Sequence, residues 1–150
     1  MSMTRQVVIL IAEDDLGHAR LIEKNLARAG LNNPIIRFEN GQVILDFLFR
    51  RGGPPRRNTE TPYLLLLDIR MPQVDGVEVL RQVKEDNELR KIPVIMLTTT
   101  DDPREVERCH GLGCSSYIVK PVDYDKFADA IKNLGLFISL VEVPQISAND

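Results

Sequence analysis

Residues 63–76 read YLLLLDIRMPQVDG. Four consecutive leucines run directly into an aspartate, Asp68. A continuous aliphatic run of this kind is typical of a strand covered on both faces of a parallel sheet. In such sheets ligands bind in the crevice beyond the carboxyl ends of the strands. Asp68 is therefore either a residue that caps the next element or the reactive group of a site.

Similar apolar segments recur along the chain and alternate with amphipathic segments. The apolar segments predict strands at 7–12, 34–38, 63–67, 93–97 and 116–119. The segments between them repeat apolar residues at spacings of three and four, which predicts helices at 15–29, 40–49, 75–86, 101–110 and from 123 onward. This alternation predicts an α/β fold of the (βα)5 type, a doubly wound parallel five-stranded sheet with helices on both faces.

Length and composition fit one globular domain over residues 1–150. The formal charge of −3 gives no electrostatic case for binding nucleic acid. The apolar runs are too short to span a membrane, and the first residues lack the apolar core of a signal peptide. Cys109 and Cys114 are then expected to be reduced thiols, and the protein to be cytoplasmic.

Acidic residues follow the first and third predicted strands. Glu13 and Asp14 come after the first, and Asp68 after the third, so these carboxylates converge if the two strands are neighbours. Carboxylates about 4 Å apart repel by about 4 kcal/mol at an effective dielectric constant of 20, so the cluster favours a cation such as Mg²⁺. Thr98 and Lys120 end the fourth and fifth strands at the same edge. A hydroxyl and an ammonium beside a metal-bound carboxylate suit a phosphoryl group arriving at Asp68.

Four motifs in order carry a resemblance to a known family. They are AEDD at 12–15, LLLLDIRMPQVDG at 64–76, LTT at 97–99 and YIVKP at 117–121. Together they resemble the receiver domain of bacterial two-component response regulators, the CheY-like family with a flavodoxin-like fold, over about residues 5–138. More narrowly, the chain resembles single-domain regulators paired with phytochrome-type histidine kinases. The features that carry this resemblance are the Gly/Pro/Arg-rich loop at 50–62, the lack of an effector domain and an apolar tail at 139–150.

The resemblance implies a role for each site residue. Asp68 would accept a phosphoryl group from the phosphohistidine of a sensor histidine kinase, a bacteriophytochrome being one candidate. Asp14, Asp68 and the backbone carbonyl of Arg70 would bind Mg²⁺ directly, and Glu13 through a metal-bound water. Lys120 would neutralise charge on the phosphoryl oxygens. The protein would then catalyse only its own phosphorylation and dephosphorylation, and Arg70 would influence the lifetime of the phosphorylated state.

The same resemblance implies a switch. Thr98 would turn towards the phosphoryl group, Tyr117 would rotate inward, and the face formed by the fourth helix, fifth strand and fifth helix would change for protein binding. Pro121 would follow a cis bond. Two alternatives stay open: a phosphorelay intermediate that passes its phosphoryl group to a histidine phosphotransfer protein, and a scaffold that binds partners constitutively.

The end of the chain suggests a partner surface. Residues 134–143 read LGLFISLVEV, and the apolar side chains point in more than one direction on a helix. We expect a homodimer interface or a kinase contact there, because exposed apolar patches usually mark partners. The alternative is a tail folded back over its own core.

Several other readings of single motifs are weaker. Cys109, His110 and Cys114 lack a fourth zinc ligand, and His18 is expected at the surface. A dehalogenase-type nucleophile usually has a second acid two residues on, where this chain has Arg70. Four arginines in the loop 50–62 could form an anion-binding patch, although a solvated loop is the simpler interpretation.

Overall fold

The computed structural model describes residues 6–140, in which strands and helices alternate. The strands are β1 (Val8–Ala12), β2 (Ile35–Phe38), β3 (Tyr63–Leu67), β4 (Val94–Thr98) and β5 (Ser116–Val119). The helices are α1 (Leu16–Arg28), α2 (Gly41–Leu48), α3 (Gly76–Glu85), α4 (Pro103–Leu112) and α5 (Tyr124–Leu140), with a short 3₁₀ helix η1 (Leu89–Lys91) before β4. Each predicted element is present with its ends shifted by at most two residues, and only η1 was not predicted.

The five strands form one parallel sheet in the order β2-β1-β3-β4-β5. The chain moves from β1 to β2 on one side and returns to place β3 on the other. The crevice between β1 and β3 is therefore the topological switch point, where ligands bind in sheets of this type. Ala12 lies opposite Leu67 at the end of this strand pair. The acidic residues that follow them consequently leave the sheet side by side.

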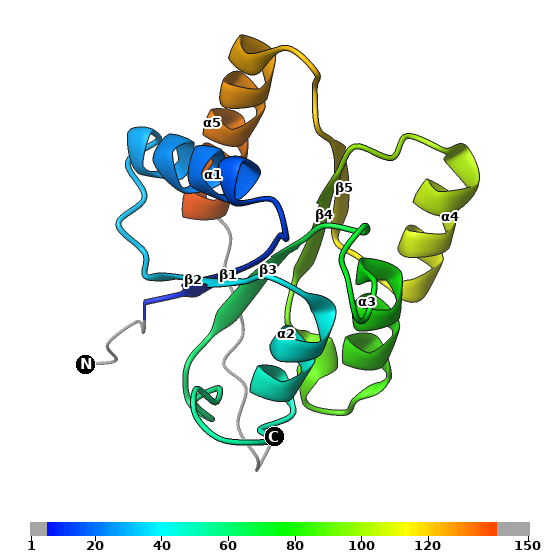
Figure 1. Cartoon of the computed structure of the whole chain (residues 1–150). Coiled ribbons are helices and arrows are strands. Elements are labelled where there is room, and N and C mark those ends of the chain that lie inside the picture. Colours follow the sequence, from blue (N-terminus) through cyan, green and yellow to red (C-terminus); the bar gives the residue numbers. More distant parts are fainter. Residues whose placement is uncertain (1–5, 141–150) are drawn as a thin grey trace.

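Helices cover both faces of the sheet (Figure 1), as the sequence predicts. Helices α1 and α5 lie on one face, and α2, α3 and α4 on the other. Alternate strand residues divide between the two cores: Ile9 and Ile11 pack with α1 and α5, whereas Leu10 and Ala12 join the larger core on the opposite face. Burial on both faces explains why residues 64–67 are all leucine.

Side-chain caps determine where several helices begin. Asp15 and Asp75 are N-caps, accepting from the backbone N–H groups of His18 (3.0 Å) and Glu78 (2.9 Å). Helix α4 begins at Pro103 and not at residue 101, because Asp102 is its N-cap and proline suits the first helical position. It ends at Leu112 and is followed by the C-cap Gly113, whose φ of 107° is in the left-handed region.

One expectation about the loop before β3 is wrong, whereas most of the predicted tail is not described. The segment between α2 and β3 contains no helix or strand, as predicted, yet Arg57 within it is only 6% exposed, so a fully solvated loop is wrong. Helix α5 continues to Leu140, and residues 141–150 of the predicted tail lie outside the described residues. Across residues 6–140, every helix is too short or too polar to cross a bilayer.

Candidate functional site

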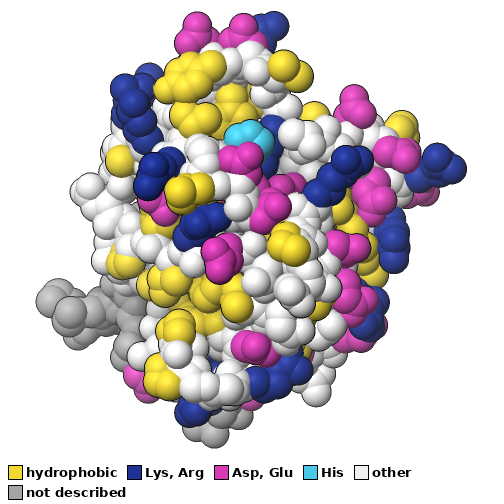
Figure 2. Space-filling view, in the orientation of Figure 1, with side chains coloured by type: hydrophobic (Ala, Val, Ile, Leu, Met, Phe, Trp, Pro, Cys, Tyr) yellow, Lys and Arg dark blue, Asp and Glu magenta, His cyan; other side chains and the backbone are white. Residues whose placement is uncertain are grey.

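Three carboxylates meet at the carboxyl edge of the sheet. One oxygen from each of Glu13, Asp14 and Asp68 lies within 4.8 Å of the others. Glu13 is 2% exposed and Asp68 is 8% exposed, while Asp14 faces solvent. Figure 2 shows acidic side chains beside a histidine near the beginning of α1. The neighbouring β1 and β3 bring these residues together, as the sequence predicts.

The ammonium group of Lys120 enters the cluster from the end of β5. The side chain is 4% exposed, forms an ion pair with Glu13, and places its Nζ atom 3.5 Å from Oδ2 of Asp68. One ammonium contacts two carboxylates of a three-carboxylate cluster, which leaves a negative surplus at the site. Hard oxygen ligands with such a surplus fit a divalent cation of the Mg²⁺ type.

Burial shifts the titration of Glu13. It raises the pKa of this carboxyl from 4.5 to about 7, and the nearby charge of Asp68 adds to the rise, while the hydrogen bond and charge of Lys120 oppose it. Desolvation is the largest of these effects. Glu13 consequently holds a proton for part of the time near neutral pH unless another cation enters the site.

The loop after β3 fixes the orientation of Asp68. Its Oδ1 accepts from the backbone N–H of Ile69 at 2.8 Å, and the carbonyl of Ile69 accepts from the N–H of Gly76 at 2.7 Å. A Cβ atom on Gly76 would lie 1.9 Å from the Asp68 carbonyl oxygen. Glycine is therefore required where α3 begins, because the helix starts in direct contact with the backbone of Asp68. The Arg70 side chain points into solvent.

Thr98 and Tyr117 lie beside the cluster on β4 and β5. Thr98 is fully buried, and its hydroxyl accepts from the N–H of Thr100 at the long distance of 3.5 Å. Within residues 6–140, no hydrogen bond joins Thr98 to Asp68. The Tyr117 hydroxyl donates to the carbonyl of Thr100 at 2.7 Å, its ring packs against the larger core, and burial raises its pKa to about 12. The two predicted switch residues thus share the backbone of Thr100 as a neighbour.

Two residues of the site were missed in the sequence. The imidazole Nδ1 of His18 lies 3.2 Å from the Lys120 ammonium, and its ring stacks on Phe127. Arg37 donates to the carbonyl oxygens of Glu13 and Asp14 and so holds the loop after β1. His18 is three residues after the N-cap of α1, in its first turn, but its contacts with Lys120 and Phe127 depend on how α1 packs against α5.

Two further sequence interpretations can be judged in the structure. Cys109 and Cys114 are free and buried, and among the described residues the acidic cluster is the one group arranged to hold a metal ion, so the weak zinc reading is not supported. The cis bond expected before Pro121 is wrong. In the described chain the cis bond precedes Pro55, and X–Pro bonds in general favour trans by about 0.5–1 kcal/mol.

Comparisons with known proteins agree with this fold and site. Residues 9–132 match the family described as response regulator receiver domain. The chain belongs to this family, whose members act in phosphorylation-dependent two-component signalling. The sequence resemblance and the flavodoxin-like receiver fold are thereby confirmed.

Among its relatives, a receiver domain from Rhodospirillum rubrum is 49% identical, with a TM-score of 0.88 and 94% and 99% of the two chains covered. Response regulator Rcp1 of Synechocystis sp. is 33% identical over 75% of this chain and 76% of its own. The structure of the Mn²⁺-bound form of Rcp1 aligns with a TM-score of 0.82 and 28% identity. The alignment covers 91% of this chain and 98% of the Rcp1 chain. The phosphorylated cyanobacterial phytochrome response regulator RcpA is 27% identical, with a TM-score of 0.83 and coverage of 94% and 99%.

Proposed function

We propose that Asp68 accepts a phosphoryl group from the phosphohistidine of a sensor histidine kinase in the presence of Mg²⁺. The observation that carries this proposal is the convergence of Glu13, Asp14 and Asp68 around the buried ammonium of Lys120. A carboxylate is a weak nucleophile, so the site must neutralise the charge that gathers on the phosphoryl oxygens. This arrangement suits that task better than it suits a structural role.

The two oxygens of Asp68 have different surroundings. Oδ1 already accepts from the N–H of Ile69, whereas Oδ2 faces Lys120 at 3.5 Å. Oδ2 is therefore the better placed oxygen to attack phosphorus, forming the new P–O bond as the bond to the histidine nitrogen breaks. Lys120 would hold a phosphoryl oxygen during this transfer. Its ion pair with Glu13 keeps the ammonium in position beforehand.

The residues present fit a resident Mg²⁺. Asp14, Asp68 and the backbone carbonyl of Arg70 would hold the ion directly, and Glu13 would contact one of its waters. When bound, the metal supplies charge neutralisation and orients the phosphoryl donor. The Mn²⁺-bound form of the relative Rcp1 supports a divalent site in this family member as well.

The output would be a change in the surface formed by α4, β5 and α5. Thr98 would donate to the phosphoryl group, and the Thr100 backbone to which Tyr117 is tied would follow. Phosphorylation would then favour one packing of this surface over another, as a population shift. Because Tyr117 is half-buried and hydrogen-bonded in this structure, the switch would act mainly by tightening or releasing that contact.

We further propose a phytochrome-type kinase as the donor and a homodimer as the signalling form. The similarity to the phytochrome response regulator RcpA supports the first. For the second, Val119, Val122, Tyr124 and Phe137 are exposed on β5, α5 and the segment between them. An apolar surface on the predicted switch face suits a protein partner.

Incubation with acetyl phosphate, followed by intact mass measurement, tests the central proposal. We expect a gain of one phosphoryl group that requires Mg²⁺ and is lost in Asp68→Asn. Asp75→Asn is the matched control, since Asp75 is a carboxylate on the same loop and asparagine preserves its N-cap role. Incorporation that persists in Asp68→Asn would place the acceptor elsewhere. No incorporation with acetyl phosphate or with histidine kinases would favour a constitutive scaffold.

A further inference from the structure

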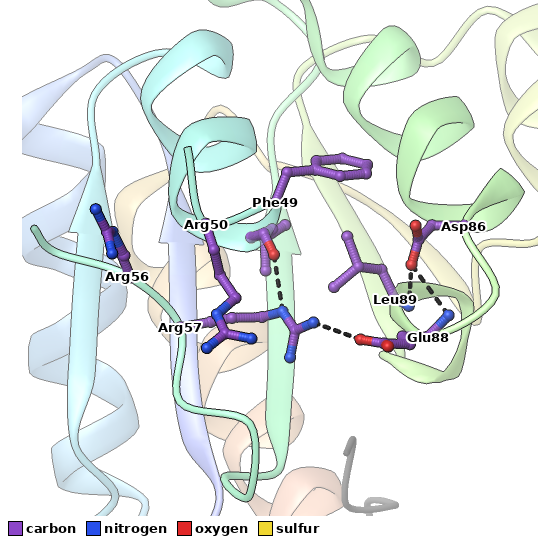
Figure 3. Close-up of a pocket in the computed structure, with 8 residues that line it drawn as sticks. Phe49, Arg50, Arg56, Arg57, Asp86, Glu88 and Leu89 are labelled. Carbon is purple, nitrogen blue, oxygen red and sulfur yellow. Dashed lines mark hydrogen bonds and ion pairs between the residues drawn. The ribbon is translucent and has the colours of Figure 1, made fainter. Parts of the chain in front are cut away.

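A separate cavity lies at the opposite edge of the sheet from Asp68. Its volume is about 440 Å³, and its walls come from the end of α2, the loop before β3, the end of α3 and η1 (Figure 3). These segments precede β3 and β4, so the cavity is at the amino edge, whereas Asp68 follows β3 at the carboxyl edge. The phosphoacceptor chemistry makes no use of this cavity.

Arg57 fixes the walls of the cavity. Its Nε donates to the carbonyl of Leu48 and its Nη2 to the carboxylate of Glu88, both at 2.7 Å. The third nitrogen, Nη1, is buried and has no acceptor within residues 6–140. A buried donor left without a partner costs about 1–3 kcal/mol, and such groups usually mark the place of a water, ion or ligand.

The charges around the cavity do not cancel. Glu88 is neutralised by Arg57, and Oδ2 of Asp86 accepts from the backbone N–H groups of Glu88 (3.0 Å) and Leu89 (2.8 Å). Neither Arg50 nor Arg56 has a carboxylate partner in the described part of the chain. In Figure 3 the Arg50 side chain extends towards Arg57, whereas Arg56 lies apart from the other labelled residues and donates through Nε and Nη2 to the carbonyl of Gly52 (3.3 and 2.8 Å). The result is a local positive surplus on a chain whose net charge is −3.

The backbone of Arg50 adds an independent observation. Its φ of 59° is in the left-handed region, and its N–H donates to the carbonyl of Phe47 at 3.3 Å. The N–H of Arg51 donates to the carbonyl of Asp46 at 2.8 Å, which completes a helix-ending motif in which glycine is the usual residue at position 50. An L-residue there costs about 1–2 kcal/mol. An arginine at this strained position, beside a cavity, suggests that its side chain is used.

We propose that this cavity binds a small organic phosphate of about mononucleotide size. Arginine forks match phosphate oxygens, and Arg50 offers a fork without a carboxylate partner among the described residues, while the buried Nη1 of Arg57 offers a further donor. Arg56 adds uncompensated charge nearby. Phe49, which is partly exposed, provides apolar surface for the organic part of the ligand. The volume falls within the range of about 300–1,000 Å³ that is typical of small-molecule sites. The loop 50–62 thus has a binding function of its own, independent of phosphorylation at Asp68.

The proposal is tested by NMR titration of the full chain with AMP and with inorganic phosphate, without Mg²⁺. We expect saturable shifts of the amide signals of Phe49, Arg57 and Leu89, and at least threefold tighter binding of AMP than of phosphate. The double variant Arg50→Ala/Arg56→Ala should bind AMP at least tenfold more weakly. Arg104→Ala, at an exposed arginine on α4, is the matched control and should leave binding unchanged.

The possible outcomes separate clearly. Both substituted arginines are exposed, so the double variant should fold, and an otherwise unchanged spectrum verifies this. Shifts that do not saturate, that are confined to residues near Asp68, or that persist in the double variant would overturn the site. Equal affinity for AMP and inorganic phosphate would show that the apolar wall takes no part, which would overturn the proposed class of ligand.

Discussion

Two buried cations lie at opposite edges of the sheet, and their surroundings differ. Lys120 at the carboxyl edge contacts Glu13 and Asp68 and shares its site with the carboxylate of Asp14. Arg57 at the amino edge is paired with one carboxylate, Glu88, and one carbonyl. The first cation is outnumbered by negative groups, whereas the second is matched.

The difference indicates which cation takes part in phosphoryl chemistry and which one fixes the segments around it. A matched buried pair satisfies its own charges and fixes the segments that carry it. An unmatched cluster retains an affinity for a further cation and for a group that changes the charge on Asp68. Substitutions at one edge, compared with matched substitutions elsewhere, therefore test this division.

The largest expected effect is a loss of stability, and it separates a glycine beside Asp68 from a glycine in the loop at the other edge. Gly76→Ala places a Cβ atom 1.9 Å from the Asp68 carbonyl oxygen, whereas Gly53, in the loop at the other edge, has open space around it. We expect Gly76→Ala to lower the free energy of unfolding by about 3 kcal/mol or more, since backbone atoms must move. Gly53→Ala should change it by less than about 0.5 kcal/mol. Urea denaturation measures both, and equal stabilities would contradict the close packing under Asp68.

The next prediction concerns the rate of phosphoryl transfer. Lys120→Met removes the ammonium that faces Oδ2 of Asp68, and we expect phosphorylation by acetyl phosphate to slow by about 100-fold or more, in line with the loss of one preorganised charge. Lys126→Met, at an exposed lysine in the first turn of α5, should leave the rate unchanged. A Lys120→Met rate within tenfold of wild type would remove Lys120 from the transfer step.

Arg57→Met sharpens the comparison from the other edge. It removes the hydrogen bonds to Leu48 and Glu88, and we expect a loss of about 2 kcal/mol in the free energy of unfolding. The loss is moderate because Glu88 is partly exposed and regains water. Arg56→Met, at an exposed neighbour, should cost less than about 0.5 kcal/mol. Phosphorylation should be unaffected in both variants; a slower rate in Arg57→Met would mean that the two edges are coupled.

The sequence predicted the fold and most of the site for a simple reason. Parallel strands end at a common edge, so the alternation of elements alone predicts that Glu13, Asp68, Thr98 and Lys120 lie at the same edge of the sheet. The sequence left open whether the first and third strands are neighbours, and the pairing of β1 with β3 in the sheet meets that condition. These inferences depend on local patterns and on chain direction alone.

The remaining features depend on packing that local patterns do not encode. His18 lies at the site because α1 rests on the same face as α5, where Phe127 contacts its ring. The composition of the loop 50–62 predicts solvation on average, yet Arg57 is buried because a carbonyl at the end of α2 and the carboxylate of Glu88 both accept from it. One residue of a polar loop can thus be buried when it donates a hydrogen bond to a free carbonyl at the end of a helix.

The smallest expected effect is the pH dependence of Mg²⁺ affinity, and it is specific to the carboxyl edge. Because the pKa of Glu13 is raised to about 7 in the folded protein, protons compete with Mg²⁺, and we expect Mg²⁺ affinity to fall by up to about tenfold per unit as pH drops below 7. Protonation of Glu13 weakens Mg²⁺ binding, but in the metal-free protein the same raised pKa makes low pH favour the folded state. The folded state binds the proton more tightly, so this contribution to stability is present below pH 4.5 and is lost as pH rises through about 7. Calorimetric titration of Mg²⁺ at several pH values measures the first effect, with Glu13→Gln as the comparison. A pH slope that is unchanged in Glu13→Gln would assign the competing proton to another group.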